Sequence, residues 1–510
     1  MNVTEPLKHR IADMNIIIKN IPEEQIISDV LILPFFEDQF IELYDSIDKF
    51  VGGLISAVCR SGDFTGKLGQ VMLLPARQIN SSRLLFAGLG KLDEITQERI
   101  RQAGSKAFSA LRDLGVADIA LSTKVLNLTA PGNKFAQKPA FYFIEGGLLG
   151  MHRFERYKTG LKSKKGGKAK QNVSTISVID ADKLFNGVWL LNVTAATCLA
   201  RDLINTPAND LTPSAFAELA KSTGSNQIKV KVLERKEIEK IGMGAYLAVT
   251  KGSDQPPKFV IMEYEGKKEK SLVLIGKSVT FDSGGLDIKP GEGMERMKYD
   301  MAGGAVVLAV MKTISEMRLP VKVTAILPAV ENLIGGSATR PGDVVKTLSG
   351  KTVEIISTDA EGRLTLADAV GYAIKYIKPR AIIDIATLTG ACSMAFGGEA
   401  IAMMGTDSEL MSHLRVVSEE VHERVWPMPL FDEYGEYLKS DIADIKNVGG
   451  RKGALSSSAY FLKEFTGDTP WIHLDIAGAA WSDKDRPYSA KGATGVGVRL
   501  LLNLIKEISQ

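Results

Sequence analysis

The sequence has few of the residues that most often bind metals through nitrogen or sulfur. Its 510 residues include only three cysteines and five histidines. Cys59, Cys198 and Cys392 lie far apart with no Cys-x-x-Cys pair, which argues against a disulfide framework and a thiolate zinc site and suits a reducing compartment. No histidines stand in a His-x-x-x-His pair. Any metal ion bound by this chain must therefore be held mainly by carboxylates.

The chain also lacks a long apolar run and a strong excess of charge. No stretch approaches the ~20 apolar residues that a membrane-spanning helix requires, and the N-terminus, MNVTEPLKHRIADMNIII, has no apolar signal-peptide core. The formal net charge of +3 gives no general reason to expect nucleic acid or an anionic membrane as the main partner. With 45% hydrophobic and 24% charged residues, the composition is that of a globular protein. We therefore expect a cytoplasmic protein without a membrane partner.

Glycine loops that bind phosphate are missing as well. No Gly-x-Gly-x-x-Gly fingerprint opens a strand–helix unit. Gly276-Lys277-Ser278 follows a predicted strand, but Ser271 stands where a phosphate-binding loop needs a glycine, and no helix follows directly. The pattern argues against nucleotide binding.

The length exceeds that of one ordinary core, so we expect two domains. In the first third, a helical spacing at 93–114 lies among β-rich runs, which predicts an α/β layer structure. These runs are residues 30–36, 70–76, 83–89 and 117–123. Residues 159–172, TGLKSKKGGKAKQN, have almost nothing to bury and predict an exposed linker. We therefore expect an N-terminal α/β domain at 1–170 and a C-terminal domain at 171–510.

The second domain shows continuous apolar runs of strand length, separated by helical stretches at 302–317 and 364–377. The runs are residues 271–276, 321–327, 352–356 and 381–386. Runs without alternation are typical of a mostly parallel central sheet that is buried on both faces. The helix at 364–377 directly follows the polar sequence STDAEGR. Turns between a strand end and a helix are where open α/β sheets place ligand sites.

Three clusters of charged residues follow strand ends in this domain. Their members are Lys277, Asp282, Asp287 and Lys289 in the first, Lys298 and Asp300 in the second, and Asp359, Glu361 and Arg363 in the third. Each cluster alone is also compatible with a polar loop that caps a helix. Together, carboxylates that converge on one sheet edge need cations to neutralise them. Two divalent ions bridged by carboxylates would do this and would activate a water molecule.

These clusters closely resemble the leucyl aminopeptidase family, whose signature is Asn-Thr-Asp-Ala-Glu-Gly-Arg-Leu. Residues 357–364, STDAEGRL, match it at seven of eight positions. The segments GKSVTFDSGG, LDIKP, MKYDM, IATLTGA, HLDIAG and GATGVGVR match the family too, in its order and spacing. The resemblance covers the chain from about residue 190 to its end. It implies a metal-dependent aminopeptidase that releases N-terminal residues, preferably leucine and other apolar residues, from peptides.

The resemblance also implies which residues hold two divalent ions, Mn²⁺ or Zn²⁺. The tighter ion is assigned to Lys277, Asp282, Asp300 and Glu361. The more exchangeable ion is assigned to Asp282, Asp359 and Glu361, so that two carboxylates bridge the pair together with the attacking water. Lys289 is assigned to the oxyanion of the tetrahedral intermediate, and Arg363 to a bicarbonate or equivalent anion that accepts the proton of the water.

Substrate and assembly are further implications of the family. Met297 would line the side-chain pocket, framed by Thr387, Leu388 and Gly390. The free α-amine of the peptide would bind one metal ion, and the protein would form a homohexamer with its catalytic domains at the centre.

Two departures and two alternatives remain. Ser357 replaces the usual Asn and Ser278 a common Gly, which leaves substrate preference and the native metal open. Another two-metal hydrolase, such as a phosphatase, would more often use histidines, which are scarce here. A DNA-binding architectural or regulatory role is the alternative from another class. Only the linker lysines at 162–170 favour it, and the near-neutral charge disfavours nucleic acid.

Overall fold

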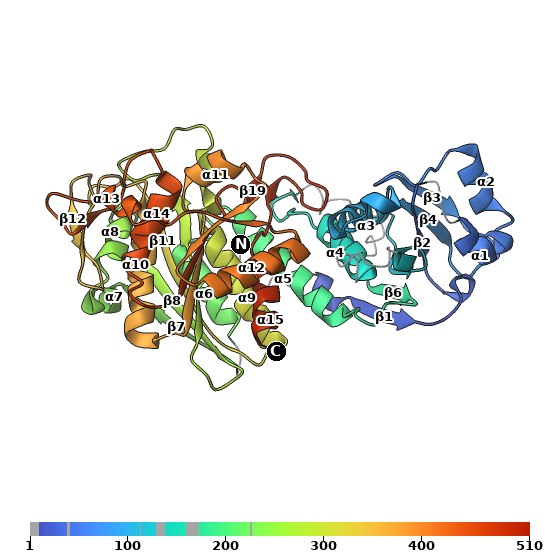
Figure 1. The fold of residues 1–510 in the computed structure, drawn as a ribbon, viewed down its shortest axis with the longest axis horizontal. Coiled ribbons are helices and arrows are strands. Elements are labelled where there is room, and N and C mark those ends of the chain that lie inside the picture. The colour runs from blue at the N-terminus through green and yellow to red at the C-terminus, as the bar shows by residue number, and fades with distance from the viewer. Residues whose placement is uncertain are drawn as a thin grey trace. The chain divides into compact units, whose positions relative to one another are not determined.

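The computed structural model describes residues 10–37, 41–112, 114–128, 138–159, 173–224 and 227–509. The chain divides into two compact units (Figure 1). One unit comprises Lys8–Ala195 with Lys484–Lys491, and the other comprises Ala196–Asp483 with Gly492–Gln510. The division between them falls within α5 (Gly187–Asn205). Residues 160–172 of the predicted linker lie outside the described residues, so the boundary at residue 170 stays a prediction.

The N-terminal unit contains a six-stranded sheet within its described residues. Its order is β1 (Asn15–Lys19), β6 (Thr175–Ile179), β5 (Asp118–Ser122), β2 (Val30–Phe35), β4 (Arg83–Gly88) and β3 (Val71–Pro75). All neighbours are parallel except β3 and β4. The helices are α1 (Asp45–Phe50), α2 (Leu54–Ser61), α3 (Gln97–Leu111) and α4 (Pro139–Met151). The strands and the helix that the sequence predicts in this third of the chain are therefore confirmed.

Close approach of α3 and α4 depends on glycine in this unit. A Cβ added at Gly104 would lie 1.9 Å from the carbonyl oxygen of Phe143, and one at Gly146 would lie 2.0 Å from that of Arg101. Any larger residue at either position would therefore force the two backbones apart.

The C-terminal unit contains a nine-stranded sheet within its described residues. Its path is β16 (Val425–Pro427), β15 (Ile401–Gly405), β18 (Trp471–Asp475), β14 (Ala381–Ala386), β9 (Leu272–Gly276), β11 (Lys322–Asn332), β8 (Lys258–Glu265) and β7 (Ile228–Leu233), with β10 (Ser278–Asp282) paired to β11. The central strands β18, β14, β9 and β11 run parallel. Antiparallel pairs lie toward the two edges. The predicted mostly parallel sheet is thus confirmed.

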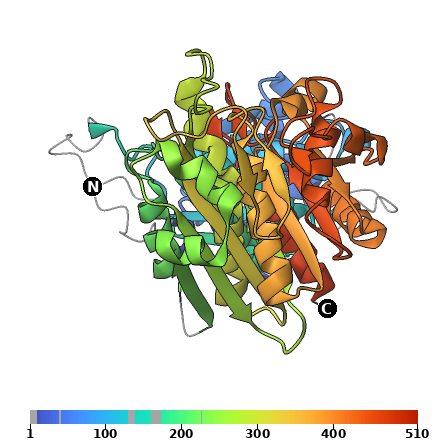
Figure 2. The ribbon, with the colours of Figure 1, turned by 90° about the vertical axis from the view of Figure 1, so that its left-hand side faces the viewer.

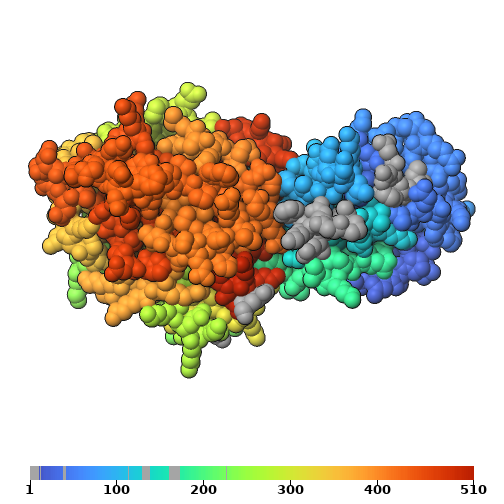
Figure 3. Space-filling view, in the orientation of Figure 1, coloured from blue at the N-terminus to red at the C-terminus, as the bar shows by residue number. Residues whose placement is uncertain are grey.

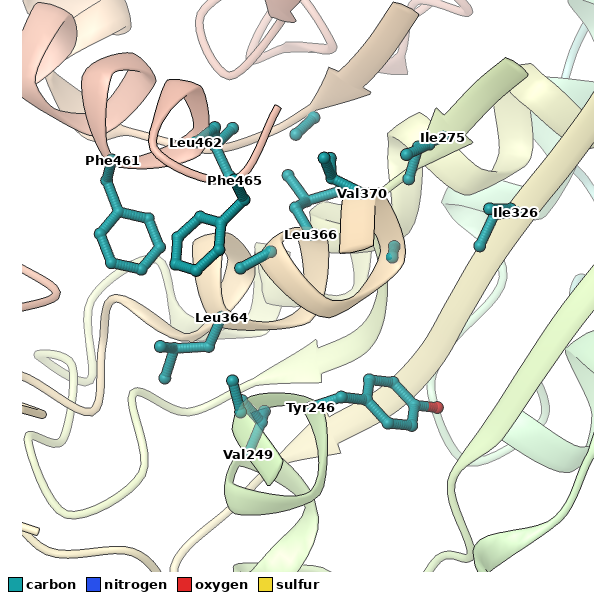
Figure 4. Close-up of a cluster of buried hydrophobic side chains, with 14 of the residues drawn as sticks. Tyr246, Val249, Ile275, Ile326, Leu364, Leu366, Val370, Phe461, Leu462 and Phe465 are labelled. Atoms are coloured by element: carbon teal, nitrogen blue, oxygen red, sulfur yellow. The ribbon is translucent and has the colours of Figure 1, made fainter. Parts of the chain in front are cut away.

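Two long helices contact the middle strands of this sheet. Val273 and Ile275 of β9 belong to a cluster of buried side chains that also includes residues of α10 (Glu361–Tyr372). In Figure 4, α10 lies between the helix that carries Phe461 and the helix that carries Tyr246. Because side chains alternate along a strand, Leu272 and Leu274 face the other side, where α9 (Ala302–Glu316) contacts the same strands. Figure 2 shows helices in front of these strands. The sheet centre is therefore covered by protein on both faces.

The other helices surround this sheet. They are α6 (Pro213–Ser222), α7 (Arg235–Ile241), α8 (Gly244–Val249), α11 (Gly390–Phe396), α12 (Ser408–Val421), α13 (Glu433–Glu436), α14 (Ala454–Lys463) and α15 (Val498–Ile508). The face of this unit that Figure 3 shows is formed largely by the later, orange to red part of the sequence.

Two structural details correct the sequence analysis. The run at 352–356 is not a strand of the central sheet: β13 (Thr352–Glu354) pairs with β12 (Val344–Lys346) and β17 (Ile445–Lys446) in a small separate sheet. Within β13 only Val353 is fully buried, so one face alone is covered. The helix expected at 364–377 begins three residues earlier, because Glu361 is the first residue of α10.

One helix also corrects the statement about apolar runs. By length and composition, α5 could cross a membrane, with a mean hydropathy of 1.2 over its best window. However, 67% of that window is buried inside the protein. A helix that is apolar on all sides is either a core helix or a membrane span. The burial of α5 indicates that its apolar residues belong to the core.

Candidate metal centre

Lys277 lies at the centre of the candidate site. It follows β9, which pairs with β11 and β14 in the middle of the sheet. Its Nζ lies 2.8 Å from Asp300 Oδ1 and 2.8 Å from Glu361 Oε1, and donates to the Thr387 carbonyl at 2.9 Å. The side chain is 3% exposed. The partners come from η9 (Met294–Met301), the first residue of α10 and the end of β14, so one ammonium group joins three separate segments.

Glycine provides the space for this lysine. A Cβ added at Gly362 would lie 2.5 Å from Lys277 Cε and 2.6 Å from its Nζ. At Gly303, near the start of α9, an added Cβ would lie 2.0 Å from the carbonyl oxygen of Ile385 and 3.0 Å from the backbone nitrogen of Lys277. The first turns of α9 and α10 can therefore approach the end of β9 only without side chains at these positions.

A second lysine bridges carboxylates on the more open side of the cluster. Lys289 Nζ lies 2.7 Å from Asp282 Oδ2 and 2.5 Å from Asp359 Oδ1. Asp282 ends β10, and its Oδ1 accepts from Asn332 Nδ2 at 2.8 Å and from the backbone of Gly284 at 2.9 Å. The side chains of Lys289 and Asp359 are 20% and 39% exposed. Solvent therefore reaches the cluster from this side.

The donor set fits divalent cations. Asp282, Asp359 and Glu361 each offer a carboxylate oxygen, and these oxygens lie within 4.8 Å of one another. Asp300 Oδ2 is buried without a hydrogen-bond partner among the described residues. Four carboxylates face two ammonium groups here, so that two negative charges would be uncompensated if all these groups were ionised. Oxygen-rich sites of this kind suit hard or borderline divalent ions.

The protonation of the cluster follows from burial and charge. Burial, and next the Glu361 charge, raise the pKa of Asp282 to about 6, and burial raises the pKa of Asp300 well above its ordinary value. Burial also disfavours the Glu361 carboxylate, but Lys277 and Lys289 outweigh it and lower its pKa. Burial likewise disfavours the Lys277 ammonium, yet its carboxylate neighbours outweigh it and raise its pKa. The lysines thus act as counter-ions of the carboxylates.

Arg363 lies in the first turn of α10 and donates hydrogen bonds to two other segments. Its Nη1 donates to the carbonyl of Asn447 at 2.7 Å, and its Nη2 donates to Ser458 Oγ at 2.8 Å. Nε is buried and has no hydrogen-bond partner among the described residues. Burial lowers the pKa of this guanidinium to about 10. Within the described residues, the buried Nε–H of Arg363 is therefore a donor that an anion could use.

The predicted substrate residues lie on two segments beside the cluster. Thr387 contacts it directly, because its hydroxyl donates to Asp300 Oδ1 at 2.8 Å and its carbonyl accepts from Lys277. The backbone N–H of Leu388 donates to Asp475 Oδ1 at 3.1 Å. Gly390 opens α11 and has open space where a Cβ would lie. Met297 is in η9, three residues before Asp300, and is partly buried.

Sequence reasoning missed the residues that hold the site loops in place. Asn332 follows a long apolar run at the end of β11, which is the same signal that marked the ligand clusters. Asp475 accepts from the backbone of Leu388 and Thr389. No pattern in the sequence marked Asn447. His473, in contrast, is a core histidine as its apolar surroundings indicate, with Nδ1 2.5 Å from Asp384 Oδ1.

Known proteins are similar to this chain over most of its length. A model of the cytosol aminopeptidase family catalytic domain matches residues 198–502, and a model of the N-terminal domain of that family matches residues 32–160. A probable cytosol aminopeptidase of Geotalea uraniireducens is 45% identical, covering 94% of this chain and 96% of the relative. One of Pseudomonas syringae pv. tomato is 40% identical, covering 96% and 98%.

Solved structures with the same fold are also similar over most of their length. The bottromycin maturation enzyme BotP in complex with Mn has a TM-score of 0.83 at 31% identity, covering 95% of this chain and 100% of the other. A mutant of tomato leucine aminopeptidase has a TM-score of 0.83 at 32% identity, covering 97% and 96%.

Enlarging Gly362 should disrupt the centre. In Gly362→Ala the new methyl group collides with Lys277, so we expect Mn²⁺ affinity, measured by calorimetry, to fall at least ~10-fold, the scale for a misplaced metal neighbour. Gly371→Ala in the same helix is the control, because its methyl group would make only an ordinary contact, 3.6 Å from Leu348 Cβ. Equal Mn²⁺ affinity in both variants would contradict this account.

Proposed function

Since the chain belongs to the cytosol aminopeptidase family and is an aminopeptidase, we propose that it cleaves N-terminal residues from peptides with two divalent metal ions at the carboxylate cluster. The observation that carries this proposal is the convergence of Asp282, Asp359 and Glu361 within 4.8 Å, beside Lys277 and Asp300. The Mn complex of BotP supports metal use in this fold.

The residues divide between two ions. Lys277, Asp282, Asp300 and Glu361 would hold the tighter ion, and Asp282, Asp359 and Glu361 the more exchangeable one. The burial of these side chains supports this order, because Asp359 is 39% exposed whereas Lys277 and Glu361 are each 3% exposed. When bound, two such ions lower the pKa of a bridging water and polarise the scissile carbonyl. Mn²⁺ or Zn²⁺ suits this donor set.

Lys289 would face the developing oxyanion. Its ammonium group pairs with Asp282 and Asp359 at the open side of the cluster. Once cations neutralise these carboxylates, Lys289 is free to donate to the carbonyl oxygen of a peptide that enters from that side. A preorganised cation at this position stabilises negative charge as it forms on the carbonyl.

Arg363 would hold bicarbonate or an equivalent anion. Its Nη1 and Nη2 each donate one hydrogen bond to protein, and the anion would accept from the buried Nε, which has no partner among the described residues. An anion held there could accept the proton of the attacking water. Loss of bicarbonate stimulation in Arg363→Lys would support this role, and an unchanged response would contradict it.

The pocket for the N-terminal residue would be formed by Met297, Thr387, Leu388 and Gly390. The hydroxyl of Thr387 already donates to Asp300 of the cluster. Met297 lies three residues before Asp300 and Leu388 directly follows Thr387, so both would supply apolar surface to the pocket. A flexible methionine fits apolar side chains of varied shape. We therefore propose a preference for leucine and methionine over aspartate, which hydrolysis of the three aminoacyl amides would test.

Assembly and location follow the relatives. We propose a cytoplasmic homohexamer. The names of the relatives, cytosol aminopeptidases, support the location, and exposed apolar side chains on the catalytic unit such as Phe431 and Ile442, which are 63% and 65% exposed, support self-association. A monomeric mass in sedimentation would contradict this assembly. The DNA-binding alternative finds no support among the relatives, and the lysines that motivated it lie outside the described residues.

Metal removal tests the proposal directly. Exhaustive chelation should abolish hydrolysis of leucine amide, and Mn²⁺, Zn²⁺, Co²⁺ or Mg²⁺ should restore it, because an oxygen-rich site discriminates weakly among these ions. N-acetylated peptides should resist cleavage under the same conditions, since the free amine is proposed as a metal ligand. Full activity of metal-free protein, or equal cleavage of blocked and free peptides, would refute the proposal.

Lys277 and Lys289 should respond differently to replacement by methionine. A lysine ligates a metal only as a neutral amine, so Lys277→Met should weaken Mn²⁺ binding and make activity depend on added ion. Lys289→Met should bind both ions normally and lower kcat ~100-fold or more, the scale for one lost oxyanion donor. Calorimetry and steady-state kinetics separate the two effects. Normal Mn²⁺ affinity in Lys277→Met would show that the assignment is wrong.

A further inference from the structure

Asn447 follows β17 and is completely buried. Its carboxamide binds the backbone of a segment 90 residues earlier in the chain. Oδ1 accepts from the N–H of Ile356 at 2.8 Å and from that of Ser357 at 3.3 Å, and Nδ2 donates to the carbonyl of Ser357 at 2.7 Å. One side chain thus satisfies three backbone groups just before Asp359.

The backbone of Asn447 extends these links. Its N–H donates to the carbonyl of Glu354 at 2.9 Å, and its carbonyl accepts from Arg363 Nη1 at 2.7 Å. The same residue therefore touches the chain on both sides of the ligands Asp359 and Glu361. No other contact described above joins these two sides through a single residue.

Asp359 has particular need of such support. It is the most exposed of the five proposed ligands, and within the described part of the chain its own N–H donates only to Ser357 Oγ, at 3.2 Å. Thr358 is fixed by the loop of the first cluster, because its N–H donates to Asp287 Oδ2 at 2.8 Å and its hydroxyl donates to Gly284 O at 2.7 Å. Asn447 fixes the preceding residue from the opposite direction. The direction of the Asp359 carboxylate depends on both attachments.

We infer that Asn447 is a positioning residue that sets the Asp359 carboxylate and the Arg363 guanidinium relative to each other. It thereby controls the affinity of the more exchangeable metal site and leaves the tighter site unaffected. This inference rests on the proposed function, because it assigns Asp359 to one ion alone. Residues that orient metal ligands typically change metal affinity or activity by ~10–100-fold when replaced.

Asp444 provides a matched control three residues away. Its Oδ2 accepts from the N–H of Thr352 at 2.7 Å and from the Thr352 hydroxyl at 2.8 Å. It therefore ties the same chain segment to the other end of β13, away from Asp359. A merely structural role in holding the small sheet together would be shared by both residues.

The experiment compares Mn²⁺ titration calorimetry, kinetics and thermal unfolding for the full-length protein and its variants Asn447→Ala, Asn447→Asp and Asp444→Ala. In both Asn447 variants, the Kd of the more weakly bound Mn²⁺ should rise ~10-fold or more. The Kd of the more tightly bound Mn²⁺ should equal that of the wild type. At limiting Mn²⁺ their kcat should fall by a similar factor, and excess Mn²⁺ should restore much of it. Asp444→Ala should match the wild type in both respects, whatever its unfolding temperature.

The volume-matched Asn447→Asp carries the test if Asn447→Ala does not fold, because it keeps the acceptor for Ile356 but places a carboxylate oxygen against the Ser357 carbonyl. Wild-type affinity for both ions in Asn447→Asp would overturn the inference, as would equal weakening in Asp444→Ala. A wild-type protein that binds fewer than two Mn²⁺ ions would instead contradict the proposed function, independently of any variant.

Discussion

The buried ammonium group of Lys277 is the interaction on which the rest of the site depends. Burying carboxylates such as Asp300 and Glu361 without a partner would cost far more than the fold could tolerate, and Lys277 lies 2.8 Å from both. The lysine therefore fixes the ends of β9 and β14, the η9 segment and the start of α10 against one another. Gly303 and Gly362 matter for the same reason, because they allow two helices to reach this point.

The sheet explains why the charged groups meet where they do. Parallel strands bring their carboxyl ends to the same edge, and β9, β10, β11 and β14 each end next to a residue of the cluster or its support. Both faces of the central strands are covered, so this edge is the place where polar groups can gather without disrupting the core. The first turn of α10 then supplies Glu361 and Arg363 together.

Burial divides the cluster into a closed and an open half. Lys277, Asp300 and Glu361 are enclosed, whereas Lys289 and Asp359 reach solvent. A tightly held ion and a cation that must meet substrate need these different surroundings, because exchange requires access and strong binding requires exclusion of water. On the open half, hydrogen bonds from Thr358 and Asn447 replace burial as the source of order.

The sequence alone determined much of the fold and the chemical inventory. Continuous apolar runs predicted β9, β11 and β14. The charged residues that interrupt them marked the clusters, because a charge at the end of a buried strand must have a purpose or a partner, and the resemblance to the family then singled out the five candidate ligands. The sequence could not place residues 352–356, since an apolar run does not say whether one face or both are covered. Composition could not separate α5 from a membrane helix either, because it does not say whether protein or lipid covers an apolar helix. The supports of Arg363 were invisible in the sequence, because Asn447 and Ser458 contact it from segments 84 and 95 residues away. Only the tertiary structure decides such contacts, because hydrogen bonds between distant segments depend on distances that the fold sets and leave no periodic pattern along the chain.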